Sequence, residues 1–467
     1  MLFSSIPFLF YYLALVLVLY AIAPRKLKNG VLLITSLLFY FWGEPKYTLL
    51  MLASITISYA AGLLVEKYRG TKLAKVFLAF GVGAGILFLG FFKYADFFIE
   101  NVNAVFGISI PLLKIALPIG ISFYTFQSLS YVIDVYRGDV PAQKNYINLA
   151  TYVALFPQLI AGPIVRYADV NVDLETRTHS MEKIAAGAFR FTIGLSKKIL
   201  IADQLGELCD IFRNTDDKSV LFYWLYAIAF GLHIYFDFSG YSDMAIGLGK
   251  IFGFRFLENF NYPYISKSIT EFWRRWHMSL GSWFRDYVYI PMGGNRCSTP
   301  RWLFNIFVVW MLTGFWHGAD WNFVIWGLYF AFFLIIEKLW LGKLLKKLPG
   351  FVSHIYTLFL VLVSFVIFNA PSMGTILTDL GGLFGALDIP VVNSNALYYM
   401  RSYAVVFILA LIGATPLVKN LAIRFSQSEK AGKIANALEA PVMIVLLLLV
   451  TAYLVDGSFS PFLYFRF

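Results

Sequence analysis

Two of the chain's five histidines stand in surroundings suited to proton transfer, the reaction that imidazole performs best near neutral pH. His317 ends an apolar run and lies within T-G-F-W-H-G-A-D-W-N at 313–322, where glycines at 314 and 318 leave room for close approach. A neutral imidazole in an apolar pocket walled by Trp316, Trp321 and Trp326 could act as the general base for a hydroxyl nucleophile. An interfacial His in an aromatic belt, with no part in chemistry, is an equal alternative.

His277 lies in a segment that mixes charge with tryptophan, E-F-W-R-R-W-H-M-S-L-G-S-W-F-R-D at 271–286. The segment is too polar to span lipid and too aromatic for a solvated loop, which favours burial in protein or beside a cavity. Guanidinium groups bind phosphate well, so a phosphorylated carrier could dock here. A loop that only orients the protein in its membrane would explain the charge but not the interleaved tryptophans. The basic residues are Lys267, Arg274, Arg275, Arg285, Arg296 and Arg301.

The other polar groups predict structural roles. Asp237 and Asp243 flank an apolar run near His233 and could orient a His or Arg, but hydrogen bonding within the core is favoured. The histidines lack metal-ligand spacing and the two cysteines are isolated, so we expect neither a metal site nor a disulfide framework.

An all-α membrane protein must position these residues. The 467-residue chain is 59% hydrophobic and only 14% charged, whereas a soluble domain is about a quarter charged. This composition excludes a soluble enzyme, a disordered protein and a small disulfide-rich domain. The formal charge of +11 suits loops beside anionic lipid, and its scatter between apolar runs argues against nucleic-acid binding.

Apolar runs predict a polytopic fold of about 10–12 transmembrane helices, with re-entrant or interfacial segments at 149–162 and 185–202. The absence of a linker or repeat predicts one membrane domain, 1–467. Within it we expect a catalytic core at 115–345, outer helices at 1–110 and 350–457, and a short aromatic tail at 458–467.

The positive-inside rule predicts the orientation of these spans. Basic clusters at 25–28, 67–75, 343–347 and 419–433 fall on the cytoplasmic side, whereas 371–397 contains no Lys or Arg and falls outside with both termini. The His277 segment then opens to the cytoplasm, and His317 lies deeper or nearer the outer face. Two polar sites at different depths suggest a passage that pairs a cytoplasmic donor with an external acceptor.

Four motifs resemble a known family. The segments R-R-W-H-M-S-L-G-S-W-F-R-D-Y-V-Y-I-P-M-G-G-N-R at 274–296 and G-F-W-H-G-A at 314–319 resemble the membrane-bound O-acyltransferase (MBOAT) family. L-P-I-G-I-S-F-Y-T-F at 117–126 and F-P-Q-L-I-A-G-P-I-V-R at 156–166 are similar to its bacterial branch. That branch contains the membrane subunits of alginate and peptidoglycan O-acetylation and of teichoic acid D-alanylation.

The resemblance covers nearly the whole chain and implies the MBOAT fold, a ring of helices around a central tunnel. It implies acyl transfer from a thioester to a hydroxyl in a multi-pass protein of the bacterial inner membrane. His317 matches the family's catalytic histidine and His277 its second characteristic histidine. We expect His317 to accept the hydroxyl proton and His277 to orient or polarise the thioester carbonyl.

The resemblance also implies the donor and the partner. We expect acetyl-CoA, or an acyl carrier thioester, as the donor substrate, with no tightly bound cofactor. Arg274, Arg275, Arg285 and Arg296 are the candidates for holding it. The expected partner for acetylation of a surface polysaccharide is an extracytoplasmic SGNH-type acetyltransferase.

Three alternatives stay open. D-alanyl transfer from a carrier protein to teichoic acid is the first, although the chain length favours the O-acetylases. A transporter without acyl chemistry is the second, but the chain shows no repeated halves. The third concerns the tail: an interfacial anchor is favoured, but Tyr464 resembles a terminal tyrosine in accessory peptides of D-alanylation and could relay the acyl group.

Overall fold

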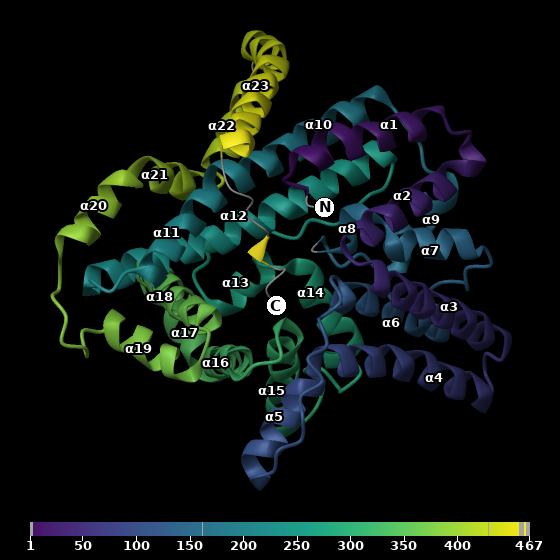
Figure 1. Cartoon of the computed structure of the whole chain (residues 1–467), viewed down its shortest axis with the longest axis horizontal. Coiled ribbons are helices and arrows are strands. Elements are labelled where there is room, and N and C mark those ends of the chain that lie inside the picture. The colour runs from purple at the N-terminus through teal and green to yellow at the C-terminus, as the bar shows by residue number, and fades with distance from the viewer. Residues whose placement is uncertain (1–2, 161, 428, 457–461, 464–467) are drawn as a thin grey trace. The chain divides into compact units, whose positions relative to one another are not determined.

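The computed structural model describes residues 3–160, 162–427, 429–456 and 462–463, and every element it assigns there is a helix (Figure 1). Contacts within the chain define two compact units, Met1–Phe191 with Met244–Leu257, and Thr192–Asp243 with Glu258–Phe467. Two of the three boundaries fall inside long helices, so α10 (Met181–Ser196) and α12 (Val220–Phe252) contribute to both units. This division cuts across the predicted core at 115–345, and the single-domain assignment stays a prediction.

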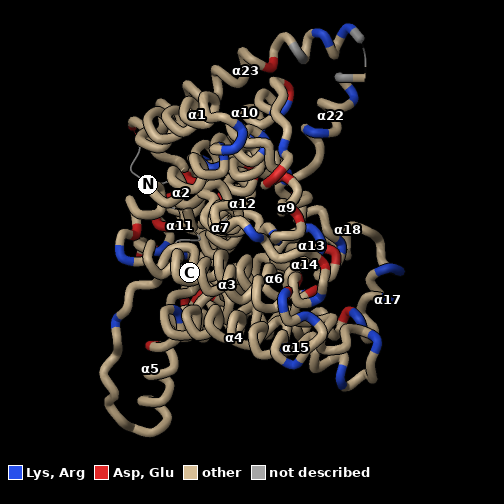
Figure 2. The backbone as a smooth tube through the Cα atoms, turned by 90° about the vertical axis from the view of Figure 1, so that its right-hand side faces the viewer, with Lys and Arg blue, Asp and Glu red and all other residues tan. Residues whose placement is uncertain are grey.

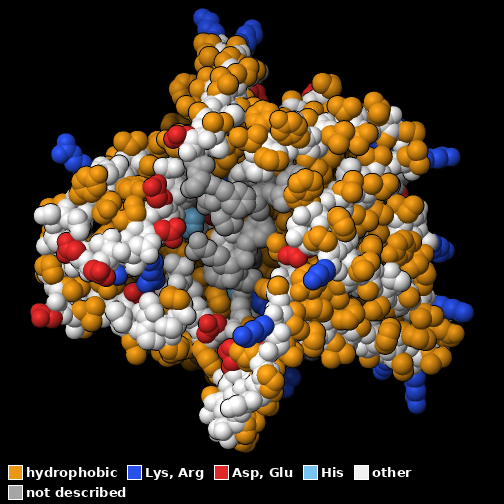
Figure 3. Space-filling model, viewed as in Figure 1, with side chains coloured by type: hydrophobic (Ala, Val, Ile, Leu, Met, Phe, Trp, Pro, Cys, Tyr) orange, Lys and Arg blue, Asp and Glu red, His pale blue; other side chains and the backbone are white. Residues whose placement is uncertain are grey.

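Three long helices pack together in the first unit: α3 (Pro45–Lys67), α4 (Lys72–Leu89) and α6 (Ile121–Arg137). Small residues permit this packing. A Cβ at Gly62 of α3 would overlap the Tyr131 ring of α6. Hydrophobic side chains also cover the outer face of α3 and α4, on the right of Figure 3, as expected for helices that contact lipid.

Shorter helices complete the first unit. The segment predicted to be re-entrant at 149–162 forms two short helices, because Leu155 leaves the helical conformation and Pro157 starts a new turn. The remaining elements are η1 (Pro7–Tyr12), α1 (Leu13–Ile22), η2 (Arg25–Leu27), α2 (Lys28–Gly43), η3 (Gly90–Tyr94), α5 (Ala95–Phe106), α7 (Tyr146–Ala154), α8 (Phe156–Leu159) and α9 (Tyr167–Thr176).

The second unit is built around α15 (Thr299–His317) and α16 (Trp321–Ile336), which pack along their length, with α18 (Gly350–Asn369) against α16. A Cβ at Gly314 would collide with the carbonyl oxygen of Phe323, which confirms the predicted close approach at this glycine.

The second unit contains further elements. They are η4 (Lys197–Ala202), α11 (Asp203–Asn214), η5 (Pro263–Ile265), α13 (Ile269–Arg275), α14 (Met278–Phe284), η6 (Arg285–Tyr289), η7 (Glu337–Leu341), α17 (Gly342–Leu345), α19 (Met373–Leu383), α20 (Ser394–Ser402), α21 (Ala404–Gly413), α22 (Leu417–Ser426) and α23 (Glu429–Asp456). Of these, α13, α19 and η7 pack against α16, and η6 packs against α15.

Within the described residues, six helices are long and apolar enough to cross a membrane, or seven if α20 and α21, bent by 58°, form one span. The chain is therefore an all-α polytopic membrane protein, as predicted. The predicted total of about 10–12 spans would require shorter apolar helices, such as Pro7–Ile22, to cross the membrane as well. Several other apolar runs form helices that are too short or too polar to be counted among these spans. Examples are α2, which has 16 residues, and the 19-residue α15, which carries polar residues. Figure 2 shows α3 and α4 free of charge along most of their length. The six are Pro45–Lys67, Lys72–Phe106, Val220–Phe252, Trp321–Leu345, Gly350–Asn369 and Lys430–Asp456.

Candidate active site

His317 occupies the C-terminus of α15 and is buried, with 6% of its surface exposed. A short turn joins it to α16, which Asp320 caps by accepting a hydrogen bond from the Trp321 N–H. Gly318 is required in this turn because a Cβ there would overlap the Phe323 ring. The turn thus holds the imidazole inside the second unit, among the side chains of α15, α16 and α18.

Among the described residues, the rings of Trp316, Trp326 and Phe368 meet the His317 imidazole edge to face. The ring centroids of Trp316, Trp326 and Phe368 lie 5.0, 5.0 and 5.3 Å away. The predicted contacts with Trp316 and Trp326 are confirmed, whereas Trp321, also predicted to pack there, is 47% exposed. Such walls keep the imidazole in an apolar, water-poor environment.

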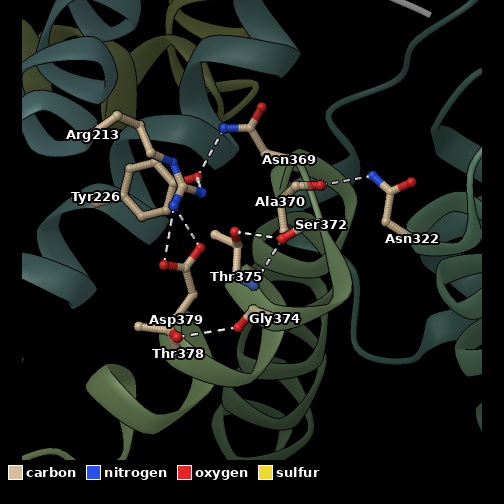
Figure 4. Close-up of polar contacts among 10 residues, drawn as sticks. All are labelled: Arg213, Tyr226, Asn322, Asn369, Ala370, Ser372, Gly374, Thr375, Thr378 and Asp379. Carbon is tan, nitrogen blue, oxygen red and sulfur yellow. Dashed lines mark hydrogen bonds and ion pairs between the residues drawn. The ribbon is translucent and has the colours of Figure 1, made fainter.

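Asn322 fixes the position of Phe368, one of the rings around His317. Its Nδ2 donates to the carbonyl oxygens of Phe368 and Ala370, at 3.0 and 2.9 Å, and its Oδ1 accepts from the Phe323 N–H. The end of α18 is therefore tied to the first turn of α16, next to His317 (Figure 4).

A buried polar cluster anchors the same segment from the other side (Figure 4). Asn369 donates to the Tyr226 hydroxyl at 2.8 Å, and this hydroxyl also accepts from the Arg213 guanidinium. Arg213 in turn forms an ion pair of 2.7 Å with Asp379, whose side chain is 4% exposed. The backbone of Phe368 and the two residues that follow it are thus anchored, so little freedom is left for the Phe368 ring against His317.

His277 has an unusual backbone conformation. It stands between α13 and α14 with φ of +45°, in the left-handed region, and is 1% exposed. A non-glycine residue there costs about 1–3 kcal/mol, and such residues cluster at functional sites. The hydrogen bond from the Met278 N–H to the Asn259 carbonyl oxygen, at 3.0 Å, helps to hold this turn. Phe238 and Trp316 pack against the imidazole, with ring centroids 4.7 and 5.9 Å away.

The Asn259 side chain determines which nitrogen of His277 carries the proton. Its Oδ1 accepts from the Ser279 N–H at 3.2 Å, and its Nδ2 donates to Ser242 at 3.2 Å, which fixes the amide orientation. The His277 Nδ1, 3.1 Å from the same Oδ1, must therefore donate. Burial lowers the pKa of His277 to about 3, so the ring is neutral at neutral pH with Nε2 unprotonated.

A cavity of about 580 Å³ lies beside His277 in the second unit, a volume typical of ligand pockets. It extends from exposed cations, Arg274, Arg285 and Lys338, to the buried imidazole. No carboxylate is among the described residues that line it, so it suits an anionic ligand with an apolar portion. The lining residues are Thr270, Trp273, Arg274, His277, Met278, Leu280, Gly281, Ser282, Phe284, Arg285, Tyr289, Ile306, Val309, Trp310, Thr313, Leu334 and Lys338.

The structure separates the four arginines predicted to hold a donor. Arg274 and Arg285 line the cavity, although Arg285 also pairs with Asp286 at 2.6 Å. Arg275 instead pairs with Glu271 at 3.0 Å, one helical turn away, and Arg296 is not among the lining residues. Lys338, which no motif indicated, also lines the cavity, because η7, which directly follows α16, brings it there.

The two aspartates expected to have structural roles pair with lysines. Asp237 binds the fully buried Lys198 at 2.6 Å, and Asp203 binds the same ammonium at 2.7 Å. Burial opposes the charge on Lys198, but these two carboxylates outweigh it and raise the pKa of the lysine. Asp243 pairs with Lys197 at 2.7 Å.

Part of the aromatic tail docks on this buried ion cluster. The Leu463 N–H donates to Asp237 at 2.9 Å, and the Lys198 ammonium lies 4.7 Å from the centre of the Phe462 ring. Both tail residues are buried, which ties the tail to α12 and η4. Tyr464, the predicted acyl relay, lies outside the described residues.

Sequence comparison now identifies the class of protein. The model of the membrane-bound O-acyltransferase family, MBOAT, matches residues 141–376, which include both histidines and the cavity lining. The chain belongs to this family and is a membrane O-acyltransferase. The transporter alternative therefore lacks support.

Three relatives within this family differ in how much of the chain they match. A probable alginate O-acetylase from Azotobacter vinelandii is 40% identical over the whole of both chains. A peptidoglycan O-acetyltransferase from Helicobacter pylori is 32% identical over 82% of this chain and 80% of its own. A teichoic acid D-alanyltransferase from Bacillus subtilis is 31% identical over 52% of this chain and 65% of its own.

Proposed function

We propose that this protein moves an acetyl group from a cytoplasmic thioester towards a cell-surface polysaccharide, either an alginate-like exopolysaccharide or peptidoglycan. Similarity over the full length to an alginate O-acetylase supports this choice, because the D-alanyltransferase aligns with only 52% of the chain. The observation that carries the proposal is the cation-lined cavity that reaches His277, with Trp316 in contact with both His277 and His317.

The donor in this proposal is acetyl-CoA, bound as a substrate and not as a resident cofactor. Arg274, Arg285 and Lys338 would pair with its phosphates, since guanidinium and ammonium groups bind phosphate oxygens strongly. The aromatic and aliphatic lining, including Trp273 and Trp310, would hold the uncharged part and lead the thioester towards His277.

His317 acts as the general base in the proposed mechanism. It takes the proton from the acceptor hydroxyl as the oxygen attacks the thioester carbonyl. The new C–O bond forms, the C–S bond breaks, and the proton passes to the departing thiolate. General-base help of this kind contributes about a hundred- to ten-thousandfold in rate.

For His277 we propose a role that fits its protonation state. Polarising a carbonyl, as expected from the resemblance, requires a proton on Nε2, but Asn259 accepts the Nδ1 proton and the ring is neutral. Nε2 is then a hydrogen-bond acceptor that orients an N–H or O–H group of a substrate. His277 would thus hold the donor or the acceptor in line, while His317 moves the proton.

We also propose a membrane location and a partner for this protein. The protein would lie in the bacterial inner membrane, with the cavity open to the cytoplasm, and would work with an extracytoplasmic SGNH-type acetyltransferase. The chain's own tail could relay the acetyl group at Tyr464, a step supported only by the docking of Phe462 and Leu463 on the Lys198 cluster. Mass spectrometry of the tail during turnover, without the external partner, should then detect acetyl-tyrosine, and its absence would argue against the relay.

A donor comparison tests the proposed function. The purified protein in lipid nanodiscs is given radiolabelled acetyl-CoA or D-alanyl carrier protein, and thioester consumption is measured. We expect saturable loss of acetyl-CoA and none of the D-alanyl thioester. Consumption of the carrier thioester alone would instead assign the chain to D-alanylation.

A further inference from the structure

Three basic side chains gather around one buried tyrosine in the first unit. The Lys28 ammonium lies 4.1 Å from the centre of the Tyr20 ring, and the guanidinium carbon of Arg177 lies 5.7 Å from it. The His179 ring is 5.5 Å from the same centre. Lys183 stands one helical turn beyond His179, near the start of α10. We call Lys28, Arg177, His179 and Lys183 the Tyr20 cluster.

Hydrogen bonds fix these side chains in place. The Tyr20 hydroxyl has one proton, which it donates to the Phe252 carbonyl oxygen at 2.7 Å. It must therefore accept from Arg177 Nε and from His179 Nε2, both at 2.8 Å. The Lys28 ammonium donates to the Tyr20 carbonyl oxygen at 2.7 Å. Basic side chains that only orient a protein in a membrane have no need of such bonds.

Lys183 is held in the same way, because its ammonium donates to the Thr178 hydroxyl at 2.7 Å and to the Thr178 carbonyl oxygen at 3.2 Å. Thr178 directly precedes His179. The fourth cation thus lies close enough to His179 for its charge to act on that imidazole, and its described hydrogen bonds are to neutral oxygen atoms.

The charges of the Tyr20 cluster are not balanced by ion pairs among the residues that the structure describes. Within the part of the chain that the structure describes, none of its members forms an ion pair, whereas Lys197, Lys198 and Arg213 each have a carboxylate within 2.7 Å. Burial, followed by the charges of Arg177 and Arg25, lowers the pKa of Lys28. Burial, followed by Lys28 and Arg177, likewise lowers the pKa of His179. An anion would relieve this repulsion.

The neighbouring surface points to the source of that anion. Helix α1 carries Tyr20 near its C-terminal end, and it exposes Leu15, Val18 and Ile22 by 58%, 59% and 73%. Fixed cations beside an exposed apolar helix match the two parts of a phospholipid, a phosphate and its acyl chains. The apolar surface would contribute nothing to the binding of a free phosphate ion.

We propose that the Tyr20 cluster binds the phosphodiester head group of an anionic phospholipid, with the acyl chains along α1. This site is separate from the cavity beside His277, whose lining residues all belong to the second unit. Its occupancy is independent of the proposed acyl transfer, so either proposal can fail without the other.

Retention of phosphatidylglycerol by the purified full-length protein tests the site. The protein is placed in mixed micelles of phosphatidylglycerol and phosphatidylcholine, and bound lipid is counted by native mass spectrometry. A basic residue near a membrane surface contributes about 1 kcal/mol, or roughly fivefold in affinity. We therefore expect Lys28→Gln and Lys183→Gln each to weaken phosphatidylglycerol retention about fivefold, with phosphatidylcholine unaffected.

Lys72→Gln is the matched control, because Lys72 begins α4 in the same unit, is exposed, and loses the same charge outside the cluster. Lys183→Gln is the variant less able to disturb the fold, since the described bonds of the Lys183 side chain are to Thr178. An equal loss of phosphatidylglycerol in Lys72→Gln would show a diffuse charge effect and overturn the site. Displacement of the lipid by inorganic phosphate would assign the site to a free anion and overturn it as well.

Discussion

Burial and the Asn259 carboxamide together determine the protonation state and the tautomer of the His277 imidazole. Its pKa of about 3, against 6.5 for an ordinary histidine, means that the folded protein leaves it neutral while the unfolded chain binds a proton below about pH 6.5. The stability that this residue contributes is therefore present above pH 6.5 and is lost as the pH falls towards 3.

This linkage gives a prediction for stability. As the pH falls from 6.5 to 4, His277 should lower the free energy of unfolding by up to about 1.4 kcal/mol per pH unit. The uncharged His277→Gln variant should show a shallower fall in melting temperature over this range. Parallel pH profiles for the two proteins would contradict the buried neutral state.

The cavity cations give a second prediction. Arg274→Gln and Lys338→Gln should each raise the KM for acetyl-CoA about tenfold with little change in kcat, because a hydrogen bond to a charged group is worth about 1.5–3 kcal/mol. Arg296→Gln is the control, since Arg296 carries the same charge but does not line the cavity. Equal effects in all three variants would show that only the overall charge matters.

Helix ends, and not helix interiors, position the candidate catalytic groups. The sequence alone placed His317 at the end of an apolar run beside Trp316 and Trp326, and α15 ends at this residue. The Gly314 contact was also predictable, because a small residue in an apolar helix indicates close packing. Phe368 was not, because it is separated from His317 by two helices and no periodicity links them.

Asn259, Asn322 and Lys338 were missed for a related reason. A single asparagine or lysine has no pattern in the sequence, and its importance arises only when folding brings it to a histidine or a cavity. Asn322 could have been suspected from the G-F-W-H-G-A-D-W-N run that contains it, but its bonds to Phe368 and Ala370 depend on the position of α18.

The hydrogen bonds of Asn322 between α16 and α18 give a prediction for stability and activity. Asn322→Asp keeps the shape but removes the two donors, and each carbonyl left unsatisfied costs about 1–3 kcal/mol. We expect a lower melting temperature and a fall in kcat, as Phe368 loosens against His317. Asn395→Asp is the control, because Asn395 makes one exposed bond to Asp217. Unchanged kcat and stability in Asn322→Asp would refute the anchoring role.

For the whole molecule, composition and the family motifs predicted an all-α membrane acyltransferase correctly, and the total of about 10–12 spans stays a prediction beyond the six or seven long apolar helices of the described residues. Hydropathy describes each apolar run by itself and does not indicate burial by other helices, as for the 17-residue α6, which is buried along most of its length and packs against α3 and α4. The passage from a cytoplasmic donor to an external acceptor stays a prediction.

Orientation in the membrane can be tested by cysteine labelling. In a Cys209→Ser/Cys297→Ser background, Lys343→Cys should react with an impermeant maleimide only after the cells are opened, and Val391→Cys should react in intact cells. Val391 is 71% exposed in a region without Lys or Arg, which suits a reporter of the outer side. Reversed labelling would invert the topology and place the donor cavity outside.

The central claim is that His317 is the base for acyl transfer, and His317→Ala tests it most directly. Turnover of acetyl-CoA to a polysaccharide acceptor, measured in nanodiscs for matched amounts of folded protein, should fall at least about a hundredfold, with membrane expression unchanged. Binding of acetyl-CoA should persist, because His317 does not line the donor cavity. Normal turnover in His317→Ala would contradict the mechanism.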